Sequence, residues 1–188
     1  MLGGAQGRGG GGVLMTTKQR GLSLIELLIG LAIVGILVMT ALPSYTAWLQ
    51  NTKIRNAAES VSNGLQLARA EAVRQNTNVE FVLGTASDWT VGVVGAATPI
   101  QSRSSAQGSI GVTVEPTPGA ANTVTFNSLG RVAPNAGGST SLTAIDFNVP
   151  TSILPADQSR ELQVTVSAGG GIRMCDPTVT EMTDTRRC

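Results

Sequence analysis

The first long pattern in the chain is an apolar run followed by an amphipathic one. From Leu22 to Leu42 almost every residue is apolar, and Glu26 is the only charged residue in the run. A helix of this length would span roughly 30 Å, the thickness of the hydrocarbon core of a bilayer. The pattern therefore predicts a membrane-length helix that carries one carboxyl group near its start.

After Pro43 the apolar positions recur at helical spacing, with charged residues on the other faces. The expected buried stripe is Ile54, Ala57, Ala58, Val61, Leu65, Ala68 and Ala72. We therefore expect one long helix from about Leu22 to Arg74. Proline removes a backbone donor and crowds the preceding turn, so the pattern also predicts a kink or a local melt at Pro43.

Beyond Gln75 the helical pattern stops, and short β-rich runs alternate with segments rich in Gly, Pro, Ser, Thr and Asn. The expected strands are Val79–Leu83, Trp89–Val94, Ser109–Glu115, Thr123–Phe126, Ala144–Val149, Glu161–Ser167 and Gly171–Cys175. The expected loops are Thr98–Gly108, Pro116–Asn122 and Pro134–Thr140, and Gly169-Gly170 is typical of a hairpin turn. The fold class that follows is α+β, with the long helix packed on an antiparallel sheet.

The carboxyl group of Glu26 requires a physical explanation. A lone acid in hydrocarbon costs at least about 2.5 kcal/mol. An ordinary secretory signal peptide would have a shorter apolar core ending in a small-x-small cleavage site. A plain single-pass anchor has the right length but leaves the cost of Glu26 unexplained. The sequence therefore predicts a specific partner for this carboxylate.

The charged residues around the apolar run predict its orientation. Arg8, Lys18 and Arg20 precede the run, which places the N-terminal side in the cytoplasm by the positive-inside rule. The rest of the chain would then lie beyond the membrane. Without those three residues the chain has ten basic and twelve acidic residues. The remaining chain has no net positive charge that would attract nucleic acid.

Two cysteines, Cys175 and Cys188, lie near the end of the chain. An oxidising compartment beyond the membrane favours a disulfide between them, and two free thiols are the alternative. The bridge would close a loop of about 14 residues and contribute roughly 3 kcal/mol in the chain-entropy treatment.

The sequence offers little catalytic chemistry. It contains no histidine, which excludes Ser-His-Asp triads, Cys-His dyads and histidine-bearing zinc sites. Asp176 and Asp184 lie between the two cysteines, where they would either bind calcium or, as we favour, stabilise turns. We expect a protein that is not an enzyme and that holds no metal and no cofactor.

The block from Arg20 to Leu28 resembles the processing site of type IV prepilins and type II secretion pseudopilins. Gly21 matches the residue before the cut, Glu26 the acid at the fifth mature position, and Pro43 the proline at the twenty-second. The family usually has Phe after the cut, where this chain has Leu22. The resemblance implies that a prepilin peptidase cuts between Gly21 and Leu22, that the new amine of Leu22 is methylated, and that Glu26 pairs with the amine of a neighbouring subunit.

Later motifs resemble one branch of these proteins, the minor pilins and pseudopilins called GspH, FimT and FimU. Phe126-Asn127-Ser128-Leu129-Gly130-Arg131 is similar to their F-x-x-x-G-R signature, and the run from Leu67 to Arg74 is similar to the end of their helix. The stretch from Gly171 to Pro177, with the closing Arg186-Arg187-Cys188, resembles the FimT and FimU tail.

The resemblance implies an organisation and a location. Residues 1–21 would be a leader removed by the peptidase, residues 22–49 the transmembrane and filament-core half of the helix, and residues 50–188 a globular periplasmic domain. The start codon would be that of Met1 or Met15. The chain would span the bacterial inner membrane once and then enter a filament. Its partners would be other pilin subunits, the prepilin peptidase and the inner-membrane assembly platform.

Three functions remain open at this stage. We favour a structural minor pilin that helps to prime assembly of a type IV pilus. A type II secretion pseudopilin is a near alternative. The other is a DNA-binding pilin of the FimT kind, which uses basic residues in a G-R-x-R stretch. Here Gly171 replaces the first of those arginines, and Arg173 keeps the second. Arg186 and Arg187 would add charge if the disulfide brought them near Arg173, and phosphate contacts would then make binding salt-sensitive.

Overall fold

A computed structural model describes residue 21 and residues 23–188 of the chain. It consists of one long helix, α1 (Leu24–Gln75), followed by nine strands and a short 3-10 helix, η1 (Ala136–Gly138). Contacts divide the chain between Ala41 and Leu42, and Leu42–Cys188 form one compact unit. The expected fold class is confirmed, because a long N-terminal helix is combined with antiparallel sheets.

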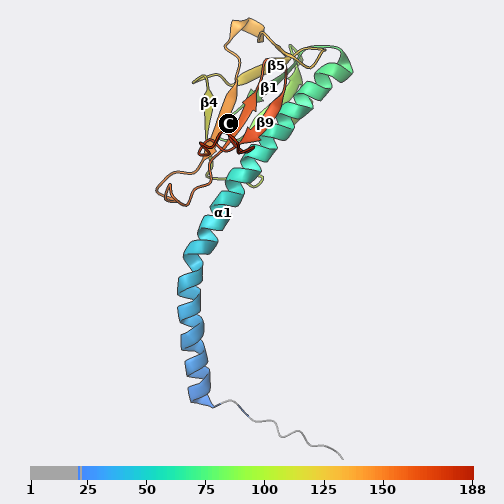
Figure 1. Cartoon of the computed structure of the whole chain (residues 1–188). Helices are drawn as coiled ribbons and strands as arrows, with labels where there is room; N and C mark the ends of the chain where they lie inside the picture. The colour runs from blue at the N-terminus through green and yellow to red at the C-terminus, as the bar shows by residue number, and fades with distance from the viewer. Residues whose placement is uncertain (1–20, 22) are drawn as a thin grey trace, which may run out of the picture. The chain divides into compact units, whose positions relative to one another are not determined.

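The first part of α1 differs from the second in burial. Every described residue from 23 to 46 is exposed. From Ile54 to Ala72 the helix buries the stripe that the apolar spacing predicts, and this stripe belongs to the hydrophobic core. Figure 1 shows this later part of α1 running alongside the strands.

Helix α1 continues without a break through Pro43, so the expected local melt is not present. A proline deletes a single donor, which leaves the neighbouring helical hydrogen bonds in place. The hydroxyl of Thr46 donates to the Pro43 carbonyl at 2.8 Å and that of Thr40 to the Leu37 carbonyl at 2.9 Å. These bonds give nearby backbone carbonyls a partner on the exposed helix surface.

The strands form two antiparallel sheets rather than the single sheet that we expected. The five-stranded sheet has the order β3 (Gln101–Arg103), β2 (Trp89–Val93), β1 (Val79–Leu83), β5 (Thr123–Phe126), β6 (Val132–Ala133). The four-stranded sheet has the order β4 (Thr113–Thr117), β7 (Ala144–Asn148), β8 (Leu162–Val166), β9 (Ile172–Cys175).

The assignments of 98–108, 109–115 and 116–122 from the sequence were wrong in part, and one short strand was missed. The segment 98–108 contains β3, and Val132–Ala133 form β6. The strand expected at 109–115 begins later and runs through Pro116 to Thr117, into a segment predicted to be a loop. Proline is tolerated there because β4 is an edge strand. Short, exposed strands such as β3 have no alternating apolar pattern that sequence reasoning could detect.

One core joins α1 to the sheets. All three phenylalanines, Phe81, Phe126 and Phe147, are fully buried in it. Trp89 is also buried, and its indole nitrogen donates to the Ser60 hydroxyl on α1 at 2.9 Å. A Cβ at Gly64 would lie 2.9 Å from the rings of Phe81 and Trp89, so the helix approaches β1 and β2 closely there. Glycine at that position allows this packing distance.

The predicted hairpin between β8 and β9 is confirmed. The two strands pair from Gln163↔Cys175 to Val166↔Ile172. The Gly170 amide donates to the Ser167 carbonyl at 2.8 Å, and the Ser167 amide donates to the Gly171 carbonyl at 2.9 Å. Gly170 has φ +80°, a left-handed conformation that favours glycine.

Candidate functional site

Glu26 lies in the first turn of α1 and is exposed. Helical bonding begins at once, since the Leu27 amide donates to the Ser23 carbonyl at 3.1 Å. A carboxylate in the first turn is favoured by the partial positive charge of the helix N-terminus. Within the described residues, none of the ion pairs involves Glu26. The exposed carboxylate is therefore open to a partner from beyond the described residues.

The predicted cleavage site lies only partly within the described structure. Gly21 is described and exposed, whereas Leu22 lies outside the described residues, as do Lys18 and Arg20. The cut, the methylation and the two candidate start codons at Met1 and Met15 all remain predictions.

Within the part of the chain that the structure describes, the apolar surface around Glu26 is uncovered. By its length and apolar composition, α1 is able to cross a membrane. Leu24, Leu31 and Met39 are 79%, 65% and 78% exposed. An apolar surface of this extent marks contact with lipid or with other proteins. The exposed Glu26 is then the one charged side chain on a surface that must be covered.

The C-terminal loop, residues 176–187, is closed by the expected disulfide between Cys175 and Cys188. The Asp176 amide donates to the Arg186 carbonyl at 2.7 Å, which ties the loop back to the end of β9. The guanidinium of Arg173 donates to the carbonyls of Thr185 and Arg187 at 2.6 and 2.7 Å. The disulfide thus brings the arginines of the tail together, as the sequence predicts.

The charges of this region are balanced rather than basic. Arg186 forms an ion pair with Asp184 at 2.7 Å, and this contact lowers the pKa of Asp184 to about 2. Three arginines, Arg173, Arg186 and Arg187, are offset by three acids, Asp176, Glu181 and Asp184. Because Arg173 is bonded to carbonyls and Arg186 to a carboxylate, the geometry favours bracing of the loop over contact with phosphates.

The aspartates of the loop have structural partners. Asp176 accepts hydrogen bonds from the amide and hydroxyl of Thr178 at 2.9 and 2.6 Å, which is a turn geometry. Among the described residues, no group of three or more His, Cys, Asp or Glu side chains is placed to hold a metal ion. These contacts support the turn-forming interpretation of Asp176.

Sequence reasoning missed a junction that links motifs far apart in the chain. Arg69 on α1 donates from Nε to the Gly130 carbonyl at 3.1 Å. A Cβ at Gly170, in the β8–β9 turn, would lie 1.9 Å from that same carbonyl oxygen. The Val132 amide donates to the Ala168 carbonyl at 3.1 Å, which ties the two turns together. The helix-end and F-x-x-x-G-R motifs were noticed separately, but only the fold shows that they meet.

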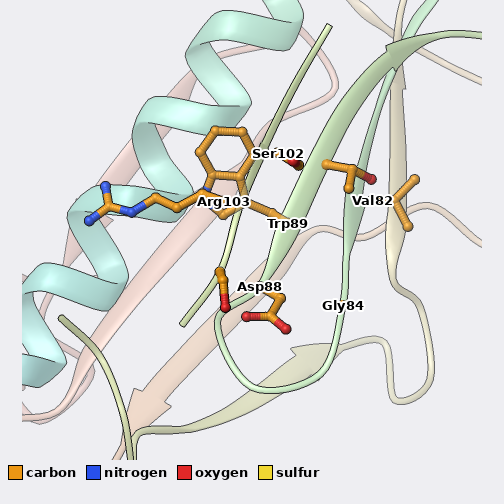
Figure 2. A pocket seen from close by; sticks show the side chains of 8 residues that line it. Val82, Gly84, Asp88, Trp89, Ser102 and Arg103 are labelled. Carbon is orange, nitrogen blue, oxygen red and sulfur yellow. The ribbon is translucent and has the colours of Figure 1, made fainter. Parts of the chain in front are cut away.

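A shallow recess of about 270 Å³ lies at the β2–β3 side of the five-stranded sheet (Figure 2). The Asp88 carboxylate in it accepts a hydrogen bond from the Ser105 amide, and this bond lowers the pKa of Asp88. Arg103 donates instead to the Gln107 carbonyl at 3.1 Å. Figure 2 shows the two side chains pointing apart. The acid thus links the β1–β2 turn to the segment that follows β3.

Two family profiles match the chain. The one described as "Type II transport protein GspH" matches residues 57–170, and the one described as "Prokaryotic N-terminal methylation motif" matches residues 16–42. The type IV major fimbrial protein FimA of Dichelobacter nodosus is 37% identical over 83 residues, which are 43% of this chain and 47% of that protein. The match thus spans about half the length of this relative.

Similar solved structures are those of a minor pilin and a minor pseudopilin. The type IV minor pilin FimU of Pseudomonas aeruginosa is 20% identical with a TM-score of 0.49, over 69% of this chain and 92% of that one. The minor pseudopilin EpsH of the Vibrio cholerae type 2 secretion system is 16% identical with a TM-score of 0.46, over 68% and 99%. The GspH profile covers more than half of this chain. The chain therefore belongs to the family described as "Type II transport protein GspH".

Proposed function

We propose that this chain is a minor pilin that is cleaved between Gly21 and Leu22, built into a type IV pilus and used to help start its assembly. The observation that carries the proposal is the exposed Glu26 in the first turn of α1, whose described residues 23–46 are all exposed. Residues 1–21 would be the leader, residues 22–49 the membrane and filament-core segment, and residues 50–188 the periplasmic domain. The prepilin peptidase and the inner-membrane assembly platform would act on it in turn.

The proposed step in assembly follows from the chemistry of Glu26. After cleavage, the amine of Leu22 is a cation at the end of an apolar segment. A carboxylate on a neighbouring helix, four residues further along, offers the opposite charge in the same low-dielectric environment. Removing one partner of such a pair leaves an uncompensated charge, which is strongly unfavourable. The pair would therefore admit a subunit only in the register that joins the two groups.

The experiment is a Glu26→Ala substitution in the full chain, expressed in a strain that lacks the native copy. We expect normal membrane insertion but loss of the chain from sheared filaments, measured by immunoblot of the membrane and filament fractions. The matched control is Glu59→Ala, which removes an exposed acid elsewhere on α1 that is paired with Arg55 at 2.7 Å. Glu59→Ala should leave incorporation unchanged. Incorporation of the Glu26→Ala chain at the normal level would overturn the proposal.

A type II secretion pseudopilin is the second candidate, and the match to the profile described as "Type II transport protein GspH" supports it. The two candidates share the processing and the Glu26 pairing but serve different machines. Deletion of the gene distinguishes them: loss of surface pili points to the pilus, and loss of protein secretion with intact pili points to the secretion system.

A further inference from the structure

The chain has very few aromatic residues, and the fold divides them into two groups. It contains three Phe, two Trp and one Tyr. The three phenylalanines and Trp89 are buried in the core. The remaining two, Tyr45 and Trp48, are 58% and 61% exposed, and their ring centroids are 6.0 Å apart. Tyr45 and Trp48, hereafter the aromatic pair, are therefore not used in the core.

The aromatic pair lies where the sequence changes from apolar to charged. The apolar run ends at Leu42, and the next charged residue is Lys53. The segment between them, residues 44–52, has no charged residue and contains Ser, Thr, Gln and Asn beside the aromatic pair. This composition is intermediate between hydrocarbon and water. Trp and Tyr are enriched at that level of a membrane because their rings have an apolar body and a polar tip.

We propose that Tyr45 and Trp48 anchor the membrane-inserted chain at the lipid headgroup region, on the side that carries the folded domain. The occupant of this surface is the bilayer interface, because the aromatic pair continues the same helix directly after its membrane-length apolar run. The inference rests on the membrane-inserted state of the proposed function. It does not depend on filament assembly.

The anchor has a consequence for the folded unit. Asn51 is less than one turn beyond Trp48, and its side-chain amide donates to the Gln158 carbonyl at 2.9 Å. The Arg160 amide in turn donates to the Asn51 Oδ1 at 2.8 Å. The connection between β7 and β8 is thus fastened to α1 immediately after the aromatic pair. The depth of the pair then sets the height of this connection above the membrane, with no spacer between them.

The test measures the depth of Trp48 in lipid vesicles. The full chain carrying Trp89→Phe, which leaves Trp48 as its only tryptophan, is reconstituted in phosphatidylethanolamine–phosphatidylglycerol vesicles. Spin-labelled lipids carry the quencher on the headgroup, near the glycerol, or deep in the acyl chain. We expect loss of Trp48 emission to be largest with the headgroup and glycerol labels and smallest with the deep label. Quenching that is largest with the deep label, or absent with all three, would overturn the anchor.

The matched control is Trp48→Phe, which leaves the buried Trp89 as the only tryptophan. Its emission should not respond to any of the labelled lipids. The difference between the native chain and Trp48→Phe also gives the Trp48 signal without any change to the core, should Trp89→Phe fail to fold. Vesicle flotation distinguishes a failure of the anchor from a failure of the membrane-inserted state. A chain that does not float with the vesicles contradicts the membrane-inserted state, whereas a floating chain whose Trp48 is unquenched contradicts only the anchor.

Discussion

Single residues explain why two distant turns of the fold each need a glycine. Gly130 and Gly170 both have positive φ, at +70° and +80°. The Gly130 carbonyl accepts the Arg69 hydrogen bond and lies where a Gly170 side chain would be. The close backbone contact leaves no room for a Cβ on Gly170, and the left-handed conformation disfavours one at both positions. The junction thus depends on glycine for two independent reasons.

Gly170→Ala should destabilise the chain by about 2–5 kcal/mol, the sum of a left-handed alanine and an overpacked contact. Gly169→Ala is the matched control, because its added Cβ would have a single neighbour, the Ser167 hydroxyl, at 4.0 Å. That change should stay within about 0.5 kcal/mol. Urea unfolding of the full chain in detergent micelles, followed by circular dichroism, measures both. Equal free energies of unfolding for the two variants would contradict the junction.

Asp184 should titrate well below an ordinary aspartate. The side-chain hydrogen bond from Arg186, assisted by the Arg186 amide, lowers its pKa from 3.8 to about 2. Because the folded pKa lies below the unfolded one, the stabilisation is present above about pH 3.8 and is lost as the pH falls through about 2. Carbon-detected NMR of the carboxyl group measures this pKa.

Arg186→Gln should raise the Asp184 pKa towards its ordinary value, while Arg187→Gln, which removes the adjacent arginine, should leave it largely unchanged. A native Asp184 pKa near 3.8, or an equal response to both substitutions, would show that the ion pair does not hold in solution.

At the scale of elements, the helix was far easier to predict than the sheets. Helical spacing of apolar residues over a long segment predicts α1 and its buried stripe, because residues on one face of a helix recur at a fixed spacing in the sequence. The strands β1 and β5 were predicted with correct bounds, since each has a buried alternating or continuous apolar pattern. The strands β3 and β6 are three and two residues long and have exposed or half-buried side chains, so their pairing depends on neighbours that sequence periodicity does not show.

The residues of the candidate site also differ in how far the sequence could predict them. Glu26, Gly21 and Pro43 were identified because they resemble a prepilin processing site, whose residues are close together in the sequence. The role of Arg173 could not be predicted, since its partners are the carbonyls of Thr185 and Arg187 in a loop that the disulfide folds back. The sequence predicted only that the disulfide would bring the three arginines close together. Only the fold shows that two of them are already bonded.

As a whole molecule, the proposed subunit would occupy two environments in turn. Before assembly, the apolar part of α1 would lie in lipid, with the aromatic pair at the interface and Glu26 without its partner. In the filament, neighbouring helices would replace the lipid and the amine of Leu22 would neutralise Glu26. The folded unit Leu42–Cys188 has its own core and disulfide, so the exchange of environment need not disturb it.

The central claim is that the chain is processed at Gly21 and then enters a filament, and one measurement tests both parts together. Intact-mass and N-terminal peptide spectrometry of the chain recovered from sheared filaments reports where it begins and whether it is modified. We expect the chain recovered from the filaments to begin at a methylated Leu22. A chain that is absent from the filaments, or that begins at Met1, at Met15 or after residue 41, would contradict it.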